Sequence, residues 1–366
     1  LCIVSIYIVV DLYKILVLAL FFWAGFVLTY YLTPVVIQVV KVKRLFEKLS
    51  ERSSHATHIP SFGGVTFYVV FIIAISVAEQ FFQMGRAVYL VPAATIMFVI
   101  GLKDDLTGIS PRNKIFAQIL ATTLLFLSTD FQVTDLHGFV GLHEANPILI
   151  IVLSFSVVIF FINAFNLIDG IDGLASSLAA FYFGVFSVVF FMLREWALLC
   201  VSIALIGMFI AFLRYNLSTD KKIFMGDTGS LFIGFIIAAF VMHLMTSDYP
   251  RLLNSIQSPN FGVFLIATLY VPVFDSIRVF VARSMEGRSP FSPDRNHIHH
   301  LLMDRFELSH RQTTARILLF NVLISFLFWL LGAFLPHLWV VVALLAMSIL
   351  FSFYLRNLRQ QMRVKN

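Results

Sequence analysis

The chain has 366 residues, of which 60% are hydrophobic and only 13% are charged, with a net charge of +6 and a mean hydropathy of +0.92. Soluble domains carry charge on about a quarter of their residues, so this composition excludes an ordinary soluble protein and indicates a polytopic membrane protein. The two cysteines, Cys2 and Cys200, are far apart and predict neither a disulfide framework nor a zinc site.

Eleven apolar segments have about the length that a membrane-spanning helix needs. The sequence therefore predicts an all-α, polytopic integral membrane protein with about eleven transmembrane helices, forming a single domain over residues 1–366. In chain order the predicted spans cover residues 14–36, 65–82, 87–102, 115–129, 147–163, 174–193, 196–213, 229–246, 261–281, 316–335 and 337–355. Five loops on one side of these spans cover residues 37–64, 103–114, 164–173, 214–228 and 282–315.

Positive charges fall mainly on one side of the predicted spans. If the N-terminus lies outside, the inside segments hold 22 of the 26 lysines and arginines, and only Lys14, Arg86, Arg194 and Arg251 lie outside. Cytoplasmic loops of membrane proteins carry the excess of lysine and arginine. The N-terminus is therefore predicted outside and the C-terminus and the five loops in the cytoplasm. Topology also explains the net charge, so no nucleic-acid partner is expected.

Six aspartates lie at or near span ends on the predicted cytoplasmic side. Ionisable residues at membrane-level helices are costly and mark functional sites by default. Six carboxylates on one face repel each other unless a cation or a cationic ligand joins them. They predict a site at the boundary between membrane and cytosol. An ion-coupled transporter is an alternative, although its acids usually lie near mid-bilayer. The six are Asp104, Asp105, Asp169, Asp172, Asp227 and Asp275.

The most specific polar segment is Asn-Ala-Phe-Asn-Leu-Ile-Asp-Gly-Ile-Asp-Gly-Leu-Ala, residues 163–175. Asn163, Asn166, Asp169 and Asp172 follow one another at intervals of three, so on a helix their polar groups line one stripe. The two glycines after the aspartates interrupt the helix and allow the backbone to approach a ligand closely. A ligand site is favoured here over a metal-free hairpin.

Two shorter acidic segments follow or begin spans. The first is Gly-Leu-Lys-Asp-Asp-Leu-Thr-Gly, residues 101–108. Its adjacent aspartates cannot share one helical face, so at a helix end one can point to a substrate and the other to a partner group. A solvated helix cap is the alternative interpretation. Lys103 and Lys114 can neutralise this pair or bind a phosphate. Phe-Met-Gly-Asp-Thr-Gly-Ser, residues 224–230, begins the eighth span. A helix N-terminus suits a phosphate, and Asp227 offers an oxygen ligand to Mg²⁺, although a plain N-cap is also open.

Two cytoplasmic loops contain histidines. In residues 292–300, His297 and His300 are three apart; zinc is disfavoured because no cysteine accompanies them, and the arginines nearby indicate an anionic ligand. A solvated basic loop is the alternative. Upstream, Asp275 and Arg278 are spaced for an internal ion pair. The first loop contains His55, followed by Gly63-Gly64. The alternative interpretations are that His55 is simply solvated and that the glycine pair forms a plain turn.

Taken in this order, these segments resemble the polyprenyl-phosphate N-acetylhexosamine-1-phosphate transferases, glycosyltransferase family 4. The resemblance covers residues 40–310, and residues 294–300, Asp-Arg-Asn-His-Ile-His-His, look most like the undecaprenyl-phosphate GlcNAc-1-phosphate transferase branch. Phospho-MurNAc-pentapeptide transferase is the alternative within the family. The family's Arg-Lys-x-His motif reads Arg-Ser-Ser-His at residues 52–55, so its lysine is absent.

The resemblance implies a reaction and its partners. A lipid phosphate attacks the β-phosphorus of a UDP-amino sugar, UMP leaves, and a lipid-linked sugar pyrophosphate forms that initiates cell-envelope polysaccharide synthesis. The implied partners are a UDP-amino sugar, undecaprenyl phosphate and membrane lipid, and a homodimer stays open. The implied location is the bacterial inner membrane, with the active site on its cytoplasmic face.

The resemblance also implies roles for single residues. Mg²⁺ is the implied cofactor, with Mn²⁺ as an alternative, and Asn166 and Asp227 are its implied ligands. Asp104 orients or deprotonates the lipid phosphate, with Asp105 beside it as the second catalytic residue. The implied substrate-binding residues hold the ribose and uracil, stack on the base, or clamp the pyrophosphate or sugar. These are His55, Asp169, Asp172, Phe224, Arg295, His297, His299 and His300.

Overall fold

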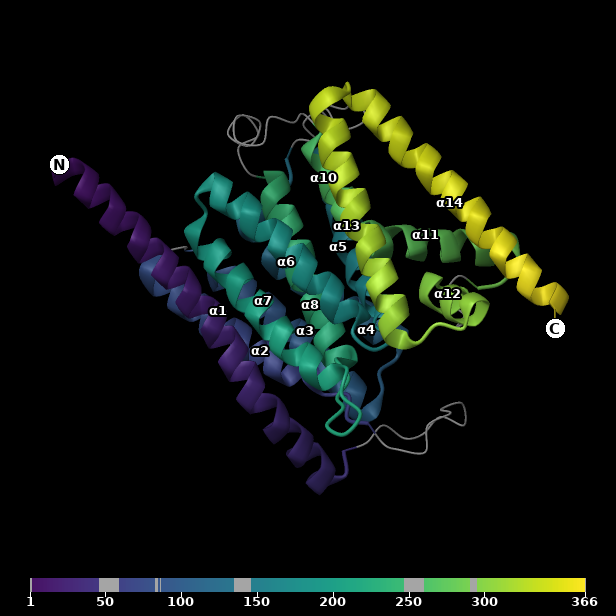
Figure 1. The fold of residues 1–366 in the computed structure, drawn as a ribbon, viewed down its shortest axis with the longest axis horizontal. Coiled ribbons are helices and arrows are strands. Elements are labelled where there is room, and N and C mark those ends of the chain that lie inside the picture. The colour runs from purple at the N-terminus through teal and green to yellow at the C-terminus, as the bar shows by residue number, and fades with distance from the viewer. Residues whose placement is uncertain are drawn as a thin grey trace. The chain divides into compact units, whose positions relative to one another are not determined.

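The computed structural model describes residues 2–45, 59–82, 85, 87–134, 146–246, 260–289 and 295–365. Within these ranges the chain forms thirteen α-helices and one 3₁₀ turn and no strand, which confirms the predicted all-α class (Figure 1). The chain packs as two compact units. Unit 1 comprises residues 1–128 and 176–237, and unit 2 comprises residues 129–175 and 238–366.

Unit 1 is built on close contacts between long apolar helices. Helices α1 and α2 both pack against α7, and α3 packs against α4. A Cβ at Gly25 of α1 would lie 2.0 Å from the carbonyl oxygen of Ala204, and one at Gly207 of α7 would lie 2.2 Å from that of Phe22. Glycine therefore allows α1 and α7 to touch backbone to backbone. The helices are α1 (Cys2–Lys43), α2 (Gly63–Phe82), α3 (Ala87–Thr107), α4 (Pro111–Leu125), α6 (Leu174–Leu193), α7 (Trp196–Asn216) and the first half of α8 (Gly226–Thr246).

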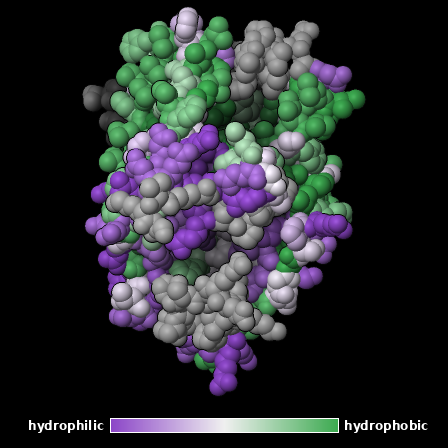
Figure 2. Space-filling view, turned by 90° about the vertical axis from the view of Figure 1, so that its right-hand side faces the viewer, coloured by the Kyte–Doolittle hydropathy of each residue, from purple (hydrophilic) through white to green (hydrophobic). Residues whose placement is uncertain are grey.

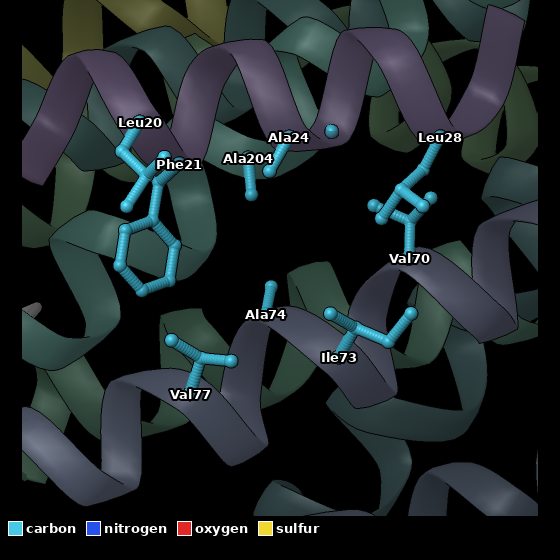
Figure 3. A pocket seen from close by; sticks show the side chains of 10 residues that line it. Leu20, Phe21, Ala24, Leu28, Val70, Ile73, Ala74, Val77 and Ala204 are labelled. Atoms are coloured by element: carbon cyan, nitrogen blue, oxygen red, sulfur yellow. The ribbon is translucent and has the colours of Figure 1, made fainter.

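A small apolar pocket of about 190 Å³ remains between α1 and α2. Figure 3 shows side chains of both helices, among them Phe21 and Val77, around this pocket, together with Ala204 of α7. Its lining is almost entirely hydrocarbon, so it offers a ligand no polar group.

Unit 2 places a bent helix pair among longer helices. Helix α10 packs against α13, α11 against α5, and α12 against both α13 and α14. The unit also holds the second half of α8. Its own elements are η1 (Thr129–Phe131), α5 (Pro147–Ile168), α10 (Phe261–Thr268), α11 (Tyr270–Met285), α12 (Ile298–Phe306), α13 (His310–Phe334) and α14 (His337–Lys365).

Helix starts follow from local capping chemistry. The side chain of Asn146 accepts a hydrogen bond from the backbone N–H of Ile148 at 2.9 Å, and Pro147 occupies the first helical position of α5. At α13, Ser309 and Gln312 form a capping box, each side chain accepting from the other residue's backbone N–H. Such caps satisfy N–H groups that have no partner inside the helix.

Eight helices within the described ranges are long and apolar enough to cross a membrane, or nine if α10 and α11 form one span. The surface agrees with lipid contact, because hydrophobic residues gather into continuous areas in Figure 2 and many large apolar side chains are exposed. The chain is therefore a membrane protein. The predicted number of eleven and the predicted orientation of the termini stay predictions.

The structure differs from the predicted spans and loops at several places. The span expected over residues 261–281 is broken, with α10 and α11 bent by 76°. The loop expected over residues 282–315 contains α12. Helix α3 continues to Thr107 and α5 to Ile168, so Asp104 and Asp105 lie on a helix and Asp169 directly follows one. Hydropathy patterns fail here because these helical turns are polar.

Candidate active site

The N-terminus of α8 is held in unit 1 by a short backbone ladder. The N–H of Phe224 donates to the carbonyl of Pro60 at 2.8 Å, and the N–H groups of Gly63 and Gly64 donate to the carbonyls of Phe224 and Met225 at 3.0 and 3.1 Å. Residues 60–64 and 224–225 thus run side by side. The pair Gly63-Gly64 is therefore the start of α2 and a docking point for α8, and not a plain turn.

Glycines also bring α2 and α3 against the backbone of α8. A Cβ at Gly64 would lie 2.2 Å from the backbone nitrogen of Gly229, and one at Gly101 would lie 2.5 Å from the carbonyl oxygen of Asp227. Real Cβ atoms do not approach other atoms so closely, so both positions need glycine. These contacts set the first turn of α8 against the acidic end of α3.

Asp105 caps this first turn of α8. Its carboxylate accepts from the backbone N–H of Asp227 at 2.9 Å, from the backbone N–H of Thr228 at 2.8 Å, and from the Thr228 hydroxyl at 2.5 Å. A carboxylate at a helix N-terminus satisfies free N–H groups and interacts favourably with the helix dipole. Asp105 therefore holds the backbone of Asp227, which lies beside it, in place.

The carboxylates of Asp104 and Asp227 lie on either side of the Lys114 ammonium group. The Lys114 ammonium contacts Asp104 in an ion pair and lies 3.3 Å from an oxygen of Asp227. Asp104 also accepts from the N–H of Ile109 at 2.8 Å. Burial lowers the pKa of Lys114, but the carboxylates of Asp227 and Asp104 outweigh it and raise that pKa above its ordinary value. Lys114 is therefore positively charged at neutral pH.

This cluster fits a cation that arrives with a phosphate ligand. Mg²⁺ is usually bound through one or two carboxylates together with substrate phosphates and waters. Asp104 and Asp227 supply such a pair, and the side chain of Asp227 is 33% exposed. Among the described residues no three His, Cys, Asp or Glu side chains form a metal group. The predicted pair of Asn166 and Asp227 is divided between the two units, and it stays a prediction.

In unit 2, the segment predicted to bind the nucleotide is tied to α13. The Asp172 carboxylate lies 3.0 Å from Nδ1 of His310, and its carbonyl accepts from the Thr314 hydroxyl at 2.8 Å. Asp169 ends α5, where its N–H donates to the carbonyl of Asn166 at 3.2 Å. The stripe predicted on a helix is therefore only partly helical, because α5 ends before Asp169 and Asp172 follows in a turn.

Asp275 is fully buried and holds the start of α12. One oxygen accepts from Arg278 at 2.8 Å and from the N–H of Ile298 at 3.1 Å. The other lies 2.9 Å from Nδ1 of His297. The ion pair predicted between Asp275 and Arg278 is thereby confirmed. His297, predicted to clamp substrate, is turned toward this carboxylate, so its Nδ1 is committed within the protein.

His299 and His300 have environments unlike that of His297. His299 is only 1% exposed, and neither of its ring nitrogens has a hydrogen-bond partner within the described part of the chain. Burial and the neighbouring His300 lower the pKa of His299 to about 3, and burial also lowers the pKa of His300. His299 is therefore neutral at pH 7. A Cβ on Gly170 would lie 2.5 Å from its Nε2, so the ring packs directly on that glycine.

The remaining predicted residues have mixed outcomes. Phe224 is half-buried and its ring lies 5.3 Å from the Lys222 ammonium. Arg295 is exposed and pairs with Asp304 at 2.9 Å. His55 lies outside the described residues. The predicted roles of these residues stay predictions.

Sequence reasoning missed two residues of these clusters. Thr228 bonds Asp105 and His310 pairs with Asp172. No pattern in the sequence marks His310, because its partner is 138 positions away. The Gly-Asp-Thr-Gly string could have marked Thr228, since polar residues at a helix start commonly enter capping bonds.

Known proteins resemble the chain over most of its length. The sequence model of the family Glycosyl transferase family 4 matches residues 87–245 of this chain. The undecaprenyl-phosphate alpha-N-acetylglucosaminyl 1-phosphate transferase of Yersinia pestis is 31% identical over 318 residues, 85% of this chain and 83% of that protein. The decaprenyl-phosphate N-acetylglucosaminephosphotransferase of Mycolicibacterium smegmatis is 32% identical over 301 residues, 75% and 72% of the two chains. A probable undecaprenyl-phosphate N-acetylglucosaminyl 1-phosphate transferase of Bacillus subtilis is 30% identical over 296 residues, 80% and 79% of the two chains. With relatives this similar over this much of its length, the chain belongs to glycosyl transferase family 4.

Proposed function

We propose that this chain transfers N-acetylglucosamine-1-phosphate from UDP-GlcNAc to a polyprenyl phosphate, releasing UMP and forming a lipid-linked sugar pyrophosphate. The observation that carries the proposal is the cluster of Asp104, Lys114 and Asp227 at the start of α8. Two anions must meet in this reaction, and a protonated lysine between two carboxylates provides both a cation for phosphate and oxygens for a metal ion. The named relatives support the same sugar and the same class of acceptor.

The chemistry is an exchange of one phosphoanhydride for a similar one. An oxygen of the lipid phosphate attacks the β-phosphorus of the donor, and the bond from that phosphorus to the oxygen of UMP breaks. A phosphate monoester has its second pKa near 6, so the acceptor is largely dianionic at pH 7 and needs little help from a base. Positioning and charge neutralisation therefore dominate catalysis. Lys114 neutralises phosphate charge, and Asp104 orients both Lys114 and the acceptor.

We assign Mg²⁺ to Asp227 in unit 1; Asn166, its other predicted ligand, belongs to unit 2 and stays a prediction. When bound, Mg²⁺ neutralises charge on the donor pyrophosphate. Asp105 contributes by holding the backbone of Asp227 in place through two N–H groups. Asp105 is thus a positioning residue whose oxygens are already occupied by donors.

In unit 2, we assign the nucleoside and sugar contacts to the neighbourhood of Gly170 and His299. A buried neutral ring with two unpaired nitrogens is unfavourable unless a ligand supplies partners. Gly170 admits this ring at close range. Asp172 is held by His310 and Thr314, which keeps the turn after α5 in place.

The acceptor's chain has a place of suitable character in unit 2. A cavity of about 620 Å³ lies between α5, α8, α10, α11 and α14. Its volume is in the range of ligand pockets, about 300–1,000 Å³. Ser154 is the single polar residue among the described residues that line it. A polyprenyl chain carries no polar group, so this cavity matches it and a nucleotide would find no partner there. We also propose that the enzyme lies in the bacterial inner membrane with its clusters facing the cytoplasm.

A donor panel tests the proposed function. Purified protein is mixed with undecaprenyl phosphate, Mg²⁺ and either UDP-GlcNAc, UDP-GalNAc or UDP-MurNAc-pentapeptide, and UMP release is measured. We expect release with UDP-GlcNAc that depends on the lipid phosphate. Preference for UDP-MurNAc-pentapeptide would show that the chain is instead a phospho-MurNAc-pentapeptide transferase. No release with any donor would contradict a transferase.

Metal removal is expected to abolish transfer. Dialysis against EDTA should reduce UMP release to background, and Mg²⁺ should restore it, because two phosphate anions must be brought together. Binding of Mn²⁺ as a spectroscopic probe should be lost in Asp227→Asn and kept in Asp220→Asn, an exposed aspartate near α8. Full activity in EDTA would contradict the metal assignment.

Gly170→Ala is expected to raise the donor's KM about tenfold, because a shift of the His299 ring by a fraction of an ångström weakens its contacts. The double variant with His299→Ala separates this route from general damage. If the effect passes through His299, adding Gly170→Ala to His299→Ala should change KM by less than about twofold. Independent, additive effects would rule out this assignment of His299.

A further inference from the structure

One side chain of α13 makes hydrogen bonds to the backbone groups that the break between α10 and α11 leaves without helical partners. Asn321 is fully buried; its Nδ2 donates to the carbonyl of Thr268 at 2.7 Å, and its Oδ1 accepts from the N–H of Val271 at 3.0 Å. These two backbone groups lie on opposite sides of the break at Leu269. Both halves of one amide are therefore used to join the two helices.

The sequence explains why the carbonyl of Thr268 needs an outside partner. In a continuous helix the carbonyl of Thr268 would accept from the N–H of residue 272, but residue 272 is proline, which has no N–H and whose ring would meet that carbonyl. In membrane proteins, the backbone groups that an interrupted helix leaves unpaired are satisfied by other parts of the protein or by ordered water. Asn321 meets this need, and Ser325, one turn later on α13, lies 2.8 Å from the Thr268 hydroxyl.

The bend determines the shape of the apolar cavity in unit 2. Residues from both sides of the break line it, including Leu265 and Ile266 of α10 and Val273 and Ile277 of α11. Because the two helix axes differ by 76°, the two sets meet this space from different directions, and this gives the cavity its present form. The cavity therefore exists in this form only while the break is held.

We propose that Asn321 is a positioning residue for the acceptor: with Pro272 it fixes the bend that shapes the cavity and so sets how well a long polyprenyl chain binds. This inference rests on the proposed function. Asn321 is not among the described residues that line the cavity, and its two hydrogen bonds go to backbone groups, so we expect it to act through the backbone of α10 and α11. The contribution is specific to the hydrocarbon part of the substrate and does not extend to the donor or to the phosphate.

The test compares Asn321→Leu with wild type on a long and a short acceptor. Leucine has nearly the same size and makes neither hydrogen bond. The KM for undecaprenyl phosphate should rise about tenfold, the order expected from losing two buried hydrogen bonds. The KM for UDP-GlcNAc and the activity on farnesyl phosphate should change by less than about twofold. Equal effects on both acceptors, or a similar change in the donor's KM, would overturn the inference.

Asn260→Leu is the matched control. Asn260 is also a fully buried asparagine of unit 2, donating to the carbonyls of Gly332 and Leu335 at 3.0 and 3.2 Å, but it does not bridge the break. It should show no dependence on acceptor length. A length dependence equal to that of Asn321→Leu would mean that loss of any buried asparagine has this effect, and the assignment to the break would be wrong.

A double variant separates positioning from stability. In Pro272→Ala with Asn321→Leu, the N–H of residue 272 becomes available to the Thr268 carbonyl, so the helix can straighten without unpaired groups. We expect the melting temperature to recover while the KM for undecaprenyl phosphate stays high. Recovery of both would overturn the inference. Wild-type release of UMP with undecaprenyl phosphate checks the proposed function separately, since its absence would contradict that function whatever the variants do.

The bend can also be measured without any substrate. Spin labels at the exposed positions Ser284 and Leu327, with both native cysteines replaced by alanine, report the distance between the end of α11 and α13. The distance distribution should shift or broaden in Asn321→Leu and stay unchanged in Asn260→Leu. An unchanged distribution in Asn321→Leu would show that Asn321 does not hold the bend, and would overturn the inference independently of activity.

Discussion

Replacing Asp105 with alanine is expected to lower the rate of UMP release at least about 100-fold, because three donors at the start of α8 lose their acceptor at once. Each buried donor left without a partner costs about 1–3 kcal/mol, and each 1.36 kcal/mol in a barrier is tenfold in rate. The N–H groups of Asp227 and Thr228 would then be free to move, and with them the carboxylate of Asp227.

A graded series sharpens this prediction. Thr228→Val removes only the hydroxyl bond to Asp105 and should reduce the rate about tenfold or less. Asp105→Asn keeps one acceptor oxygen but turns an NH₂ group toward N–H donors, so it should fall between Thr228→Val and Asp105→Ala. Asp220→Ala is the control, since Asp220 is exposed and its carboxylate accepts a hydrogen bond from the hydroxyl of the neighbouring Thr219. Thermal unfolding of each variant in detergent shows whether the protein remains folded.

The order of the series is the decisive result. If Asp105→Ala retained more than about a third of wild-type activity, well under 1 kcal/mol of transition-state stabilisation would depend on it. The capping role would then be wrong. If Asp105→Asn were as inactive as Asp105→Ala, the negative charge would matter more than the hydrogen bonds.

Gly64→Ala is expected to be the second variant with a very large effect. The new Cβ would lie 2.2 Å from the nitrogen of Gly229 and 2.4 Å from the carbonyl carbon of Thr228, and backbone atoms cannot move aside as a flexible side chain can. The start of α8 must therefore shift away from α2. A displacement of about 1 Å near reacting groups can reduce a rate 100-fold, and overpacking costs about 1–3 kcal/mol of stability.

Gly184→Ala provides the matched control for Gly64→Ala. Gly184 lies within α6 of the same unit, and a Cβ there meets nothing within 4 Å. Alanine should leave activity unchanged and raise stability by about 0.5–1 kcal/mol, because it loses less conformational freedom on folding than glycine does. Both variants are compared by UMP release and melting temperature. Normal activity of Gly64→Ala would show that the close approach of α2 and α8 is not needed.

The fold class followed from the sequence because its signal is strong and local. Runs of apolar residues long enough to span a membrane identify helices directly, and eight such helices are present in the described ranges. The break between α10 and α11 did not follow, although Pro272 was visible, because membrane helices tolerate an interior proline when neighbouring groups satisfy the freed backbone groups. What decides is the partner at position 321, about fifty residues away.

The candidate site divides in the same way. Acidic residues at span ends mark functional chemistry, so Asp104 and Asp227 could be selected without a structure. Their different roles could not, because Asp104 and Asp105 are neighbours of one type. Only the contacts distinguish them: one pairs with Lys114, and the other caps α8. Likewise, three histidines in one motif have separate environments, with His297 bound to Asp275 and His299 packed on Gly170.

Isotope exchange tests the central claim most directly, namely that the lipid phosphate itself attacks the donor. Purified protein is incubated with labelled UMP, UDP-GlcNAc and Mg²⁺, with and without undecaprenyl phosphate, and label in UDP-GlcNAc is measured. Because the reaction replaces one phosphoanhydride with another, it should be reversible, so label should enter UDP-GlcNAc when the lipid phosphate is present and stay in UMP when it is absent. Equal exchange without the lipid phosphate, or none with it, would contradict this account.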